Sequence, residues 1–282
     1  MRIHHLSCGS LCPHGGRLFG GEGGVRSRVP ICCHCLLIEA AAGLVLVDTG
    51  FGSGDARNPA QLGQPFRALL APRPRLEETA IAQVQGLGFS AGDVRQIVAT
   101  HLDPDHAGGL PDFPQAEVHV LEAERDAAVD PSLRDRSRYL RAHLGHGPRW
   151  VTHSEGGESW FGFEGIRVLP GLDAELLLIP LHGHSRGHTG VAVRDGGRWL
   201  LHCGDAYFNR AQVASPPSCP GGLAFFQRLT AADHQARIAN TERLRELAER
   251  HGDEVTLFCS HDRHELEREQ RASAAAAAPG AA

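Results

Sequence analysis

Residues 100–109 have the sequence THLDPDHAGG. They begin at the end of a short apolar segment that predicts a β-strand at Arg95–Thr100. His101 and Asp103 are two positions apart, so in an extended chain their side chains project to the same side. Asp105 and His106 come next, before a Gly-Gly turn, and can point toward a second, neighbouring position. Four ligand-type residues at the end of a strand indicate one half of a metal site. The alternative is a histidine-rich loop in which Asp103 or Asp105 caps a helix.

Three more ligand-type residues occupy comparable places later in the chain. His188 lies in the sequence GHSRGHTG, Asp205 ends the sequence LHCGD, and His261 lies in FCSHD. Each of them ends a predicted strand or opens the loop that follows one. Because such loops commonly carry functional side chains, we expect these residues to complete the site begun by residues 101–106.

Short apolar runs bounded by glycine predict strands that are buried on both faces. The predicted strands are Arg2–Ser7, Ile31–Glu39, Gly43–Asp48, Arg95–Thr100, Glu117–Leu121, Gly165–Leu169, Glu175–Pro180, Gly190–Arg194, Trp199–Cys203 and Val255–Cys259. The predicted helices are Glu77–Gly86, Glu122–Val129 and Asp233–His251, and residues 51–75 are expected to form a loop. Two strand-rich halves, each closed by a helix, indicate a layered α/β sandwich. We expect a single domain at residues 1–271 and a disordered Ala-rich tail at residues 272–282.

The composition excludes several kinds of chemistry. The chain has 282 residues, and its 28 basic residues are all arginine, so mechanisms that need a lysine amine are excluded. A net charge of −5 argues against nucleic acid as a partner, and the 18 histidines favour metal or acid–base chemistry. No apolar run suggests a signal peptide or a membrane span, and the crowded cysteines of residues 32–35 indicate a reducing compartment. We therefore expect a cytoplasmic protein without a membrane partner.

The order of these motifs resembles that of the metallo-β-lactamase superfamily, in which an HxHxDH loop is followed by a distant His, a bridging Asp and a last His. The sequence DTG at residues 48–50 also matches the early strand of this family. The resemblance implies a four-layer αββα sandwich, in which two β-sheets are flanked by helices. It further implies two metal sites, with His101, Asp103 and His188 at one, Asp105, His106 and His261 at the other, and Asp205 bridging them.

The resemblance also implies hydrolysis with two divalent metal ions, in which a hydroxide shared by the metals attacks a carbonyl and Asp105 moves protons. Zinc is the usual metal of the family. Asp103 stands where the family has histidine, and this additional carboxylate favours harder ions, so manganese and iron are alternatives. The flavodiiron branch also has a carboxylate here. A redox di-iron protein and a non-catalytic binder with a degenerate metal site are therefore alternatives from other classes.

Within the superfamily the motifs are most similar to those of the N-acyl-homoserine lactonases, which predicts a lactone or another carboxylic ester as substrate. A glyoxalase-II-like thioesterase is the alternative among hydrolases. In the lactonases a tyrosine three residues after the bridging Asp helps to hold the substrate carbonyl. Tyr207, two residues after Asp205, is predicted to take this catalytic and substrate-binding role. Phe225 and Phe226 are predicted to line an apolar rim for the substrate, and a homodimer is left open.

Overall fold

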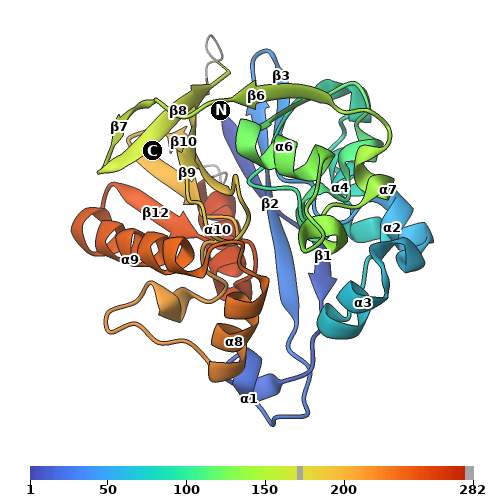
Figure 1. The fold of residues 1–282 in the computed structure, drawn as a ribbon. Coiled ribbons are helices and arrows are strands. Elements are labelled where there is room, and N and C mark those ends of the chain that lie inside the picture. The colour runs from blue at the N-terminus through green and yellow to red at the C-terminus, as the bar shows by residue number, and fades with distance from the viewer. Residues whose placement is uncertain (170–173, 277–282) are drawn as a thin grey trace.

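The computed structural model describes residues 1–169 and 174–276, and this part of the chain contains two six-stranded sheets (Figure 1). The strands of the first sheet follow one another in chain order. They are β1 (Arg2–Leu11), β2 (Ile31–Ala40), β3 (Gly43–Val47), β4 (Val94–Val98), β5 (Glu117–Leu121) and β6 (Arg149–His153). β1, β2 and β3 are antiparallel, whereas β3 to β6 run parallel, so the last four strands end at the same edge.

The second sheet has the order β12-β11-β10-β9-β8-β7. Its strands are β7 (Glu158–Trp160), β8 (Phe163–Val168), β9 (Leu176–Pro180), β10 (Thr189–Asp195), β11 (Arg198–His202) and β12 (Val255–Phe258). β11 and β12 are parallel, and the other neighbouring strands are antiparallel. Both sheets are therefore mixed.

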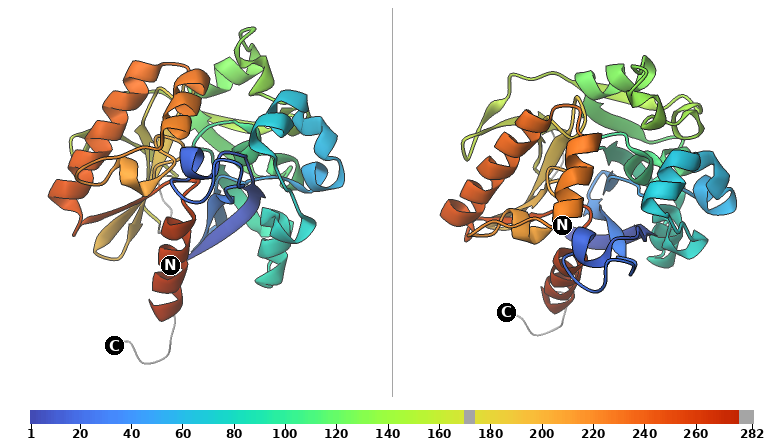
Figure 2. Two further views of the ribbon diagram at one scale, coloured as in Figure 1. Left: turned by 90° about the horizontal axis from the view of Figure 1, so that it is seen from below. Right: turned by 60° about the horizontal axis from the view of Figure 1, so that its bottom comes forward.

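Helices cover the outer faces of both sheets, which gives the expected four-layer sandwich (Figures 1 and 2). The helices over or beside the first sheet are α1 (Gly16–Phe19), α2 (Ser53–Arg57), α3 (Gln64–Leu70), α4 (Ala80–Gly86), α5 (Pro104–Ala107), α6 (Glu122–Val129) and α7 (Arg141–Leu144). Two more helices lie between β11 and β12 in the chain, α8 (Gly221–Thr230) and α9 (His234–His251), and α10 (Arg263–Ala276) follows β12. α10 packs against β1 and β2 and thus connects the end of the chain with its beginning.

Strand β2 shows how the sequence builds the layers. Cys35 and Leu37 pack into the core between the first sheet and its helices. Leu36 and Ile38 point to the opposite face, into the core between the two sheets. This two-residue alternation in a fully apolar segment is what a strand buried on both faces requires. A third core lies between the second sheet and α9, which contributes Leu244 and Leu247.

All ten predicted strands are present, with ends shifted by a few residues, and so are the three predicted helices. Residues 51–75, predicted as a loop, contain α2 and α3. The predicted disorder from residue 272 is wrong for its first part, because α10 continues to Ala276. Residues 277–282 lie outside the described part of the chain.

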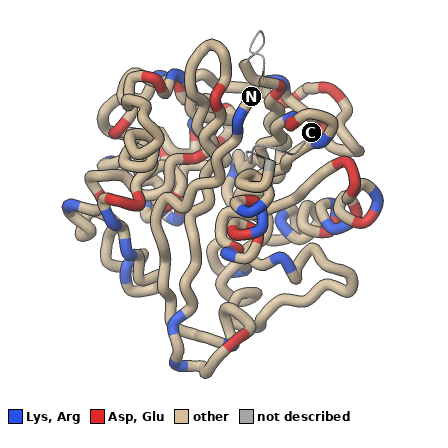
Figure 3. Tube along the Cα trace, turned by 180° about the vertical axis from the view of Figure 1, so that it is seen from behind, with Lys and Arg blue, Asp and Glu red and all other residues tan. Residues whose placement is uncertain are grey.

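Acidic and basic positions are interspersed along the trace in the view from behind (Figure 3). Among the described helices, none combines the length and hydropathy that crossing a bilayer requires.

Candidate metal centre

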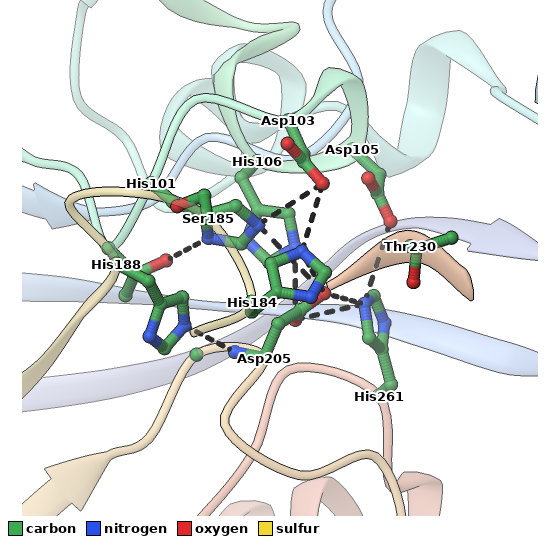
Figure 4. Close-up of polar contacts among 12 residues, drawn as sticks. His101, Asp103, Asp105, His106, His184, Ser185, His188, Asp205, Thr230 and His261 are labelled. Carbon is green, nitrogen blue, oxygen red and sulfur yellow. Dashed lines mark hydrogen bonds and ion pairs between the residues drawn. The ribbon is translucent and has the colours of Figure 1, made fainter. Parts of the chain in front are cut away.

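Four loops meet at the carboxyl ends of strands from both sheets (Figure 4). Residues 99–109 follow β4 and contain α5, residues 181–188 follow β9, residues 203–209 follow β11, and residues 259–262 follow β12. Backbone hydrogen bonds join these loops to one another, for example from the Ser260 N–H to the Gly204 carbonyl at 3.1 Å. The sandwich therefore brings together segments that are far apart in the sequence.

Asp105, His106 and His261 form one cluster of buried side chains, whose potential ligand atoms all lie within 4.8 Å of one another. Nε2 of His261 lies 3.6 Å from Oδ2 of Asp105. Nδ1 of His106 donates to Asp48 at 2.8 Å, so that Nε2 of His106 faces the cluster. The structure thus brings together the three residues that the sequence predicted for this site.

His101, His184 and Asp205 form a second buried cluster within the same distance limit. Oδ2 of Asp205 lies 3.5 Å from Nε2 of His184 and 3.9 Å from Nε2 of His101. The family resemblance implied His188 as the third residue of this site. The structure places His184 there instead.

His188 is turned toward the backbone (Figure 4). Its Nδ1 donates to the carbonyl of Leu181 at 3.0 Å, and its Nε2 accepts the N–H of Asp205 at 2.8 Å. With both ring nitrogens engaged, no lone pair of His188 is free for a cation. This geometry contradicts the predicted ligand role of His188 and gives it another task, which is to fix the backbone at Asp205.

Asp205 lies between the two clusters, which is the place expected of a bridging ligand. Its Oδ1 lies 3.1 Å from Nε2 of His261 and 3.3 Å from Nε2 of His106, while its Oδ2 faces His184. Burial alone would raise the pKa of the Asp205 carboxyl, but His261 and His106 hold that pKa well below its usual range. Asp205 is therefore a carboxylate that both clusters share.

Three buried atoms at the centre have no hydrogen-bond partner among the described residues, namely Nε2 of His101, Nε2 of His106 and Oδ1 of Asp205. Polar atoms buried in this way are costly unless something pairs with them. Imidazole nitrogens and carboxylate oxygens are ligands of zinc, manganese and iron. The donor set therefore fits a pair of divalent cations.

Hydrogen bonds behind the clusters fix the orientation of the imidazole rings. Nδ1 of His101 donates to the Thr100 hydroxyl at 2.9 Å, and this hydroxyl donates to Asp48 at 2.8 Å. Nδ1 of His261 donates to the carbonyl of Cys32 at 2.8 Å. Asp48 itself has a φ of 56°, a conformation that is uncommon outside glycine and often found at functional sites. These contacts leave each Nε2 directed into the site.

Asp103 lies beside the His101–His184 cluster and is paired with an arginine. Its Oδ2 lies 3.0 Å from Nε2 of His184 and 3.6 Å from Nε2 of His101. Nη1 of Arg138 donates to both carboxylate oxygens, at 2.9 and 2.8 Å. Burial would raise the pKa of Asp103, but Arg138 and His101 hold it well below its usual range. Arg138 balances the charge of Asp103, so the two side chains together add no net charge beside the cluster.

Glu124 is a fully buried residue of α6 that joins the loops of the site, and it was not predicted from the sequence. Its Oε1 accepts the N–H of Leu102 at 3.1 Å, and its Oε2 accepts the Ser185 hydroxyl at 2.7 Å and the Gly187 N–H at 2.9 Å. Glu124 thereby ties the loop of His101 to the loop of His184. No motif singles it out, because in the sequence it is one of several acidic residues of a predicted helix.

A cavity of about 240 Å³ opens beside the two clusters, and Asp105, His184, Asp205 and His261 all line it. The rest of its wall is largely apolar. It includes Phe66 and Leu70 of α3, Phe208, and Phe226 and Leu229 of α8.

Two predicted substrate contacts lie away from this cavity. Tyr207 is fully buried, and its hydroxyl donates to the Glu265 carboxylate at 3.1 Å, so the prediction of a substrate-binding Tyr207 is wrong. The next residue, Phe208, lines the cavity in its place. Phe226 also lines the cavity, whereas Phe225 is 67% exposed and is not among the residues of its wall. Consecutive helical residues point about 100° apart, so only one of the two phenylalanines can face the site.

Comparison with known proteins agrees with this architecture. The sequence model of the metallo-β-lactamase superfamily matches residues 30–261. A "probable metallo-hydrolase" of Mycobacterium tuberculosis is 40% identical over 263 residues, which are 93% of this chain and 80% of that protein. The N-acyl homoserine lactonase AttM of Azorhizobium caulinodans is 28% identical over 267 residues, which are 93% of each chain.

The fold is also found among solved structures. An N-acyl homoserine lactone hydrolase, determined with N-hexanoyl-L-homoserine at its catalytic metal center, superposes with a TM-score of 0.72. The likeness covers 95% of each chain at 18% identity, so it concerns the fold alone. Together with the family match, the 40% identity to a metallo-hydrolase decides the assignment. The chain therefore belongs to the metallo-β-lactamase superfamily of metallo-hydrolases.

Proposed function

We propose that this protein hydrolyses a lactone or another carboxylic ester with two divalent metal ions. The observation that carries the proposal is the pair of buried ligand clusters on either side of Asp205, at a cavity with a largely apolar wall. The relatives that are named lactonases support the choice of a lactone.

The two clusters supply ligands for both ions. One ion would be held by His101, His184 and Asp103, the other by Asp105, His106 and His261, and Asp205 would be shared. When bound, the ions would make a water nucleophilic near neutral pH and would polarise the ester carbonyl. Because Arg138 balances Asp103, we expect zinc, with manganese as the alternative.

The cavity would bind the apolar part of the substrate. Phe66, Phe226 and Leu229 would pack against an acyl chain and would exclude water from the ester once the chain is in place. The ring of Phe208 lies 4.8 Å from that of His261, so it forms an apolar wall next to the cluster. Phe208 has no hydroxyl, and it cannot donate a hydrogen bond to the substrate carbonyl.

Asp105 is the carboxylate best placed to move protons, because it both belongs to a cluster and lines the cavity. In the hydrolysis the oxygen of water forms a bond to the carbonyl carbon, and the carbon–oxygen bond to the alcohol breaks. Asp105 would accept a proton from the water and pass it to the leaving alkoxide. The products are a carboxylic acid and an alcohol, which for a lactone stay in one molecule.

The test is turnover of lactones, thioesters and phosphodiesters by the metal-loaded protein. We expect lactones with apolar acyl chains to be the best substrates, and we expect Asp205→Ala and His184→Ala to lower kcat/KM at least a hundredfold. A clear preference for thioesters would favour the glyoxalase-II-like alternative. Coloured iron that dithionite reduces, without turnover of any ester, would favour the redox alternative. If the protein neither hydrolyses an ester nor holds reducible iron, and binds less than one metal ion per chain, the result would favour a non-catalytic binder with a degenerate metal site.

A further inference from the structure

The Asp103 carboxylate contacts two kinds of groups at once. On one side its Oδ2 lies 3.0 Å from Nε2 of His184 and 3.6 Å from Nε2 of His101. On the other side both of its oxygens accept hydrogen bonds from Nη1 of Arg138. Asp103 is therefore directed at the same point as the two histidines while it is paired with a guanidinium.

Arg138 is firmly held in this position. Its Nη2 donates to the carbonyl of Thr230, in the last turn of α8, at 2.8 Å. Only 11% of its side chain is exposed. A guanidinium buried next to a site for cations is unfavourable unless an anion accompanies it, and Asp103 supplies that anion. The aspartate adds one negative charge to the site and the arginine adds one positive charge, so the pair together is neutral.

We propose that Asp103 and Arg138 work as a matched pair that takes the place of a neutral metal ligand. Arg138 is the positioning residue of this pair, because it holds the carboxylate toward the His101–His184 cluster and cancels its charge. The inference rests on the proposed function, since it requires metal ions at the two clusters.

The pair can be tested by replacing its members separately and together. Histidine is a neutral nitrogen ligand, so Asp103→His keeps a ligand but leaves the charge of Arg138 without its partner beside the cations. We expect this variant to bind the second equivalent of zinc or manganese at least tenfold more weakly than the wild type, because of the uncompensated charge. In Asp103→His/Arg138→Gln the repulsive charge is gone, and we expect affinity to return to within about threefold of the wild type.

Arg134 offers a matched control. It comes from the same segment, and its Nη2 also donates to carbonyls near the end of α8, those of Leu229 and Ala231. Within the described part of the chain, the arginine that pairs with Asp103 is Arg138, whereas the hydrogen bonds of Arg134 go to these two carbonyls. The variant Asp103→His/Arg134→Gln should therefore bind metal as weakly as Asp103→His alone.

The measurement is titration of the metal-free protein by calorimetry, with metal counted by elemental analysis and folding checked by circular dichroism. Recovery in the Arg138 double variant, without recovery in the Arg134 double variant, supports the pair. If Arg138→Gln weakens binding in the Asp103→His background, Arg138 is only a structural anchor and the inference is wrong. A wild-type protein that binds fewer than two ions contradicts the proposed function instead, which separates the two failures.

Discussion

Each carboxylate oxygen of Glu124 accepts two hydrogen bonds. Oε1 accepts the Leu102 N–H and the Tyr139 hydroxyl. Oε2 accepts the Ser185 hydroxyl and the Gly187 N–H. A glutamine at this position can accept with only one side-chain oxygen, and its amide group would face N–H or O–H donors. We expect Glu124→Gln to lower the free energy of unfolding by about 2–4 kcal/mol because buried donors lose their partner.

The measurement is urea unfolding, together with a zinc titration, which should show weaker binding because the loops of His101 and His184 are no longer tied together. Glu122→Gln is the matched control, since the Glu122 side chain lies on the same helix and is 52% exposed. Its free energy of unfolding should change by less than about 0.5 kcal/mol. Equal effects of the two substitutions would contradict the clamp that we assign to Glu124.

Replacing His184 and replacing His188 by alanine should have different effects, one mainly on metal binding and the other mainly on stability. In the metal-free protein His188→Ala leaves the N–H of Asp205 and the carbonyl of Leu181 without partners, so we expect it to lower the free energy of unfolding by about 3 kcal/mol. His184→Ala should cost less there, and instead it should reduce the tightly bound zinc from two ions to one. Unfolding in the presence of a chelator and elemental analysis measure the two effects. A loss of metal confined to His188→Ala would reverse our assignment.

The sequence could indicate which loops gather the ligand-type residues, but it could not choose between these two histidines. Both lie in the sequence GHSRGH, four residues apart, and both have the chemistry of a ligand. The choice depends on the path of the loop, in which Gly183 has a φ of 134° and His188 directly precedes β10. The same limit applies to Tyr207, because the turn at Gly204 decides whether residue 207 or residue 208 faces the cavity.

At the scale of elements, strands and long helices were predictable because their apolar patterns are strong. β2 and β9 are almost continuous runs of apolar residues. α10 has no such pattern, since few of its residues are apolar and Leu266 is one of the few that are buried. Its buried groups include carboxylates, Glu265 and Glu269, which a search for apolar periodicity cannot recognise.

One of these carboxylates makes α10 sensitive to pH. Burial raises the pKa of Glu265 from 4.5 to about 7. Between pH 4.5 and about pH 7 the folded state holds a proton on Glu265 that the unfolded state has released. The free energy of unfolding therefore falls as pH rises through this range, and above about pH 7 the ionisation of Glu265 changes it no further. The shift corresponds to about 3 kcal/mol, at 1.36 kcal/mol per pKa unit.

Glu265→Gln should therefore gain stability relative to the wild type by about 3 kcal/mol between pH 5 and pH 8, since the amide does not ionise. Urea unfolding at the two pH values, with a chelator present, gives the difference. Glu267→Gln is the control, because the Glu267 side chain lies on the same helix and is 41% exposed. A wild-type-to-variant difference that does not change with pH would contradict the ionisation of buried Glu265.

In the whole molecule, the candidate metal centre lies where loops from both sheets meet, so bound ions would connect the two halves of the sandwich. This centre gathers several buried polar atoms that have no hydrogen-bond partner among the described residues, together with three carboxylates, those of Asp103, Asp105 and Asp205. Cations that bind the folded state alone stabilise it by mass action, by about 2.7 kcal/mol at a hundredfold excess over Kd. For a chain of this size we expect zinc or manganese to raise the Tm of the metal-free protein by about 5–10 °C.

Substitution of Asp205 tests whether the stabilising ions bind at the two clusters, because Asp205 is the carboxylate that faces both of them. Asp205→Asn removes the negative charge that both sites share, and it leaves one oxygen donor where the carboxylate has two. Its Tm should rise by less than half as much as that of the wild type at the same metal concentration, as measured by differential scanning calorimetry. An equal rise in both proteins would mean that the stabilising ions bind elsewhere, and the two halves of the sandwich would then owe their connection to the apolar core between the sheets alone.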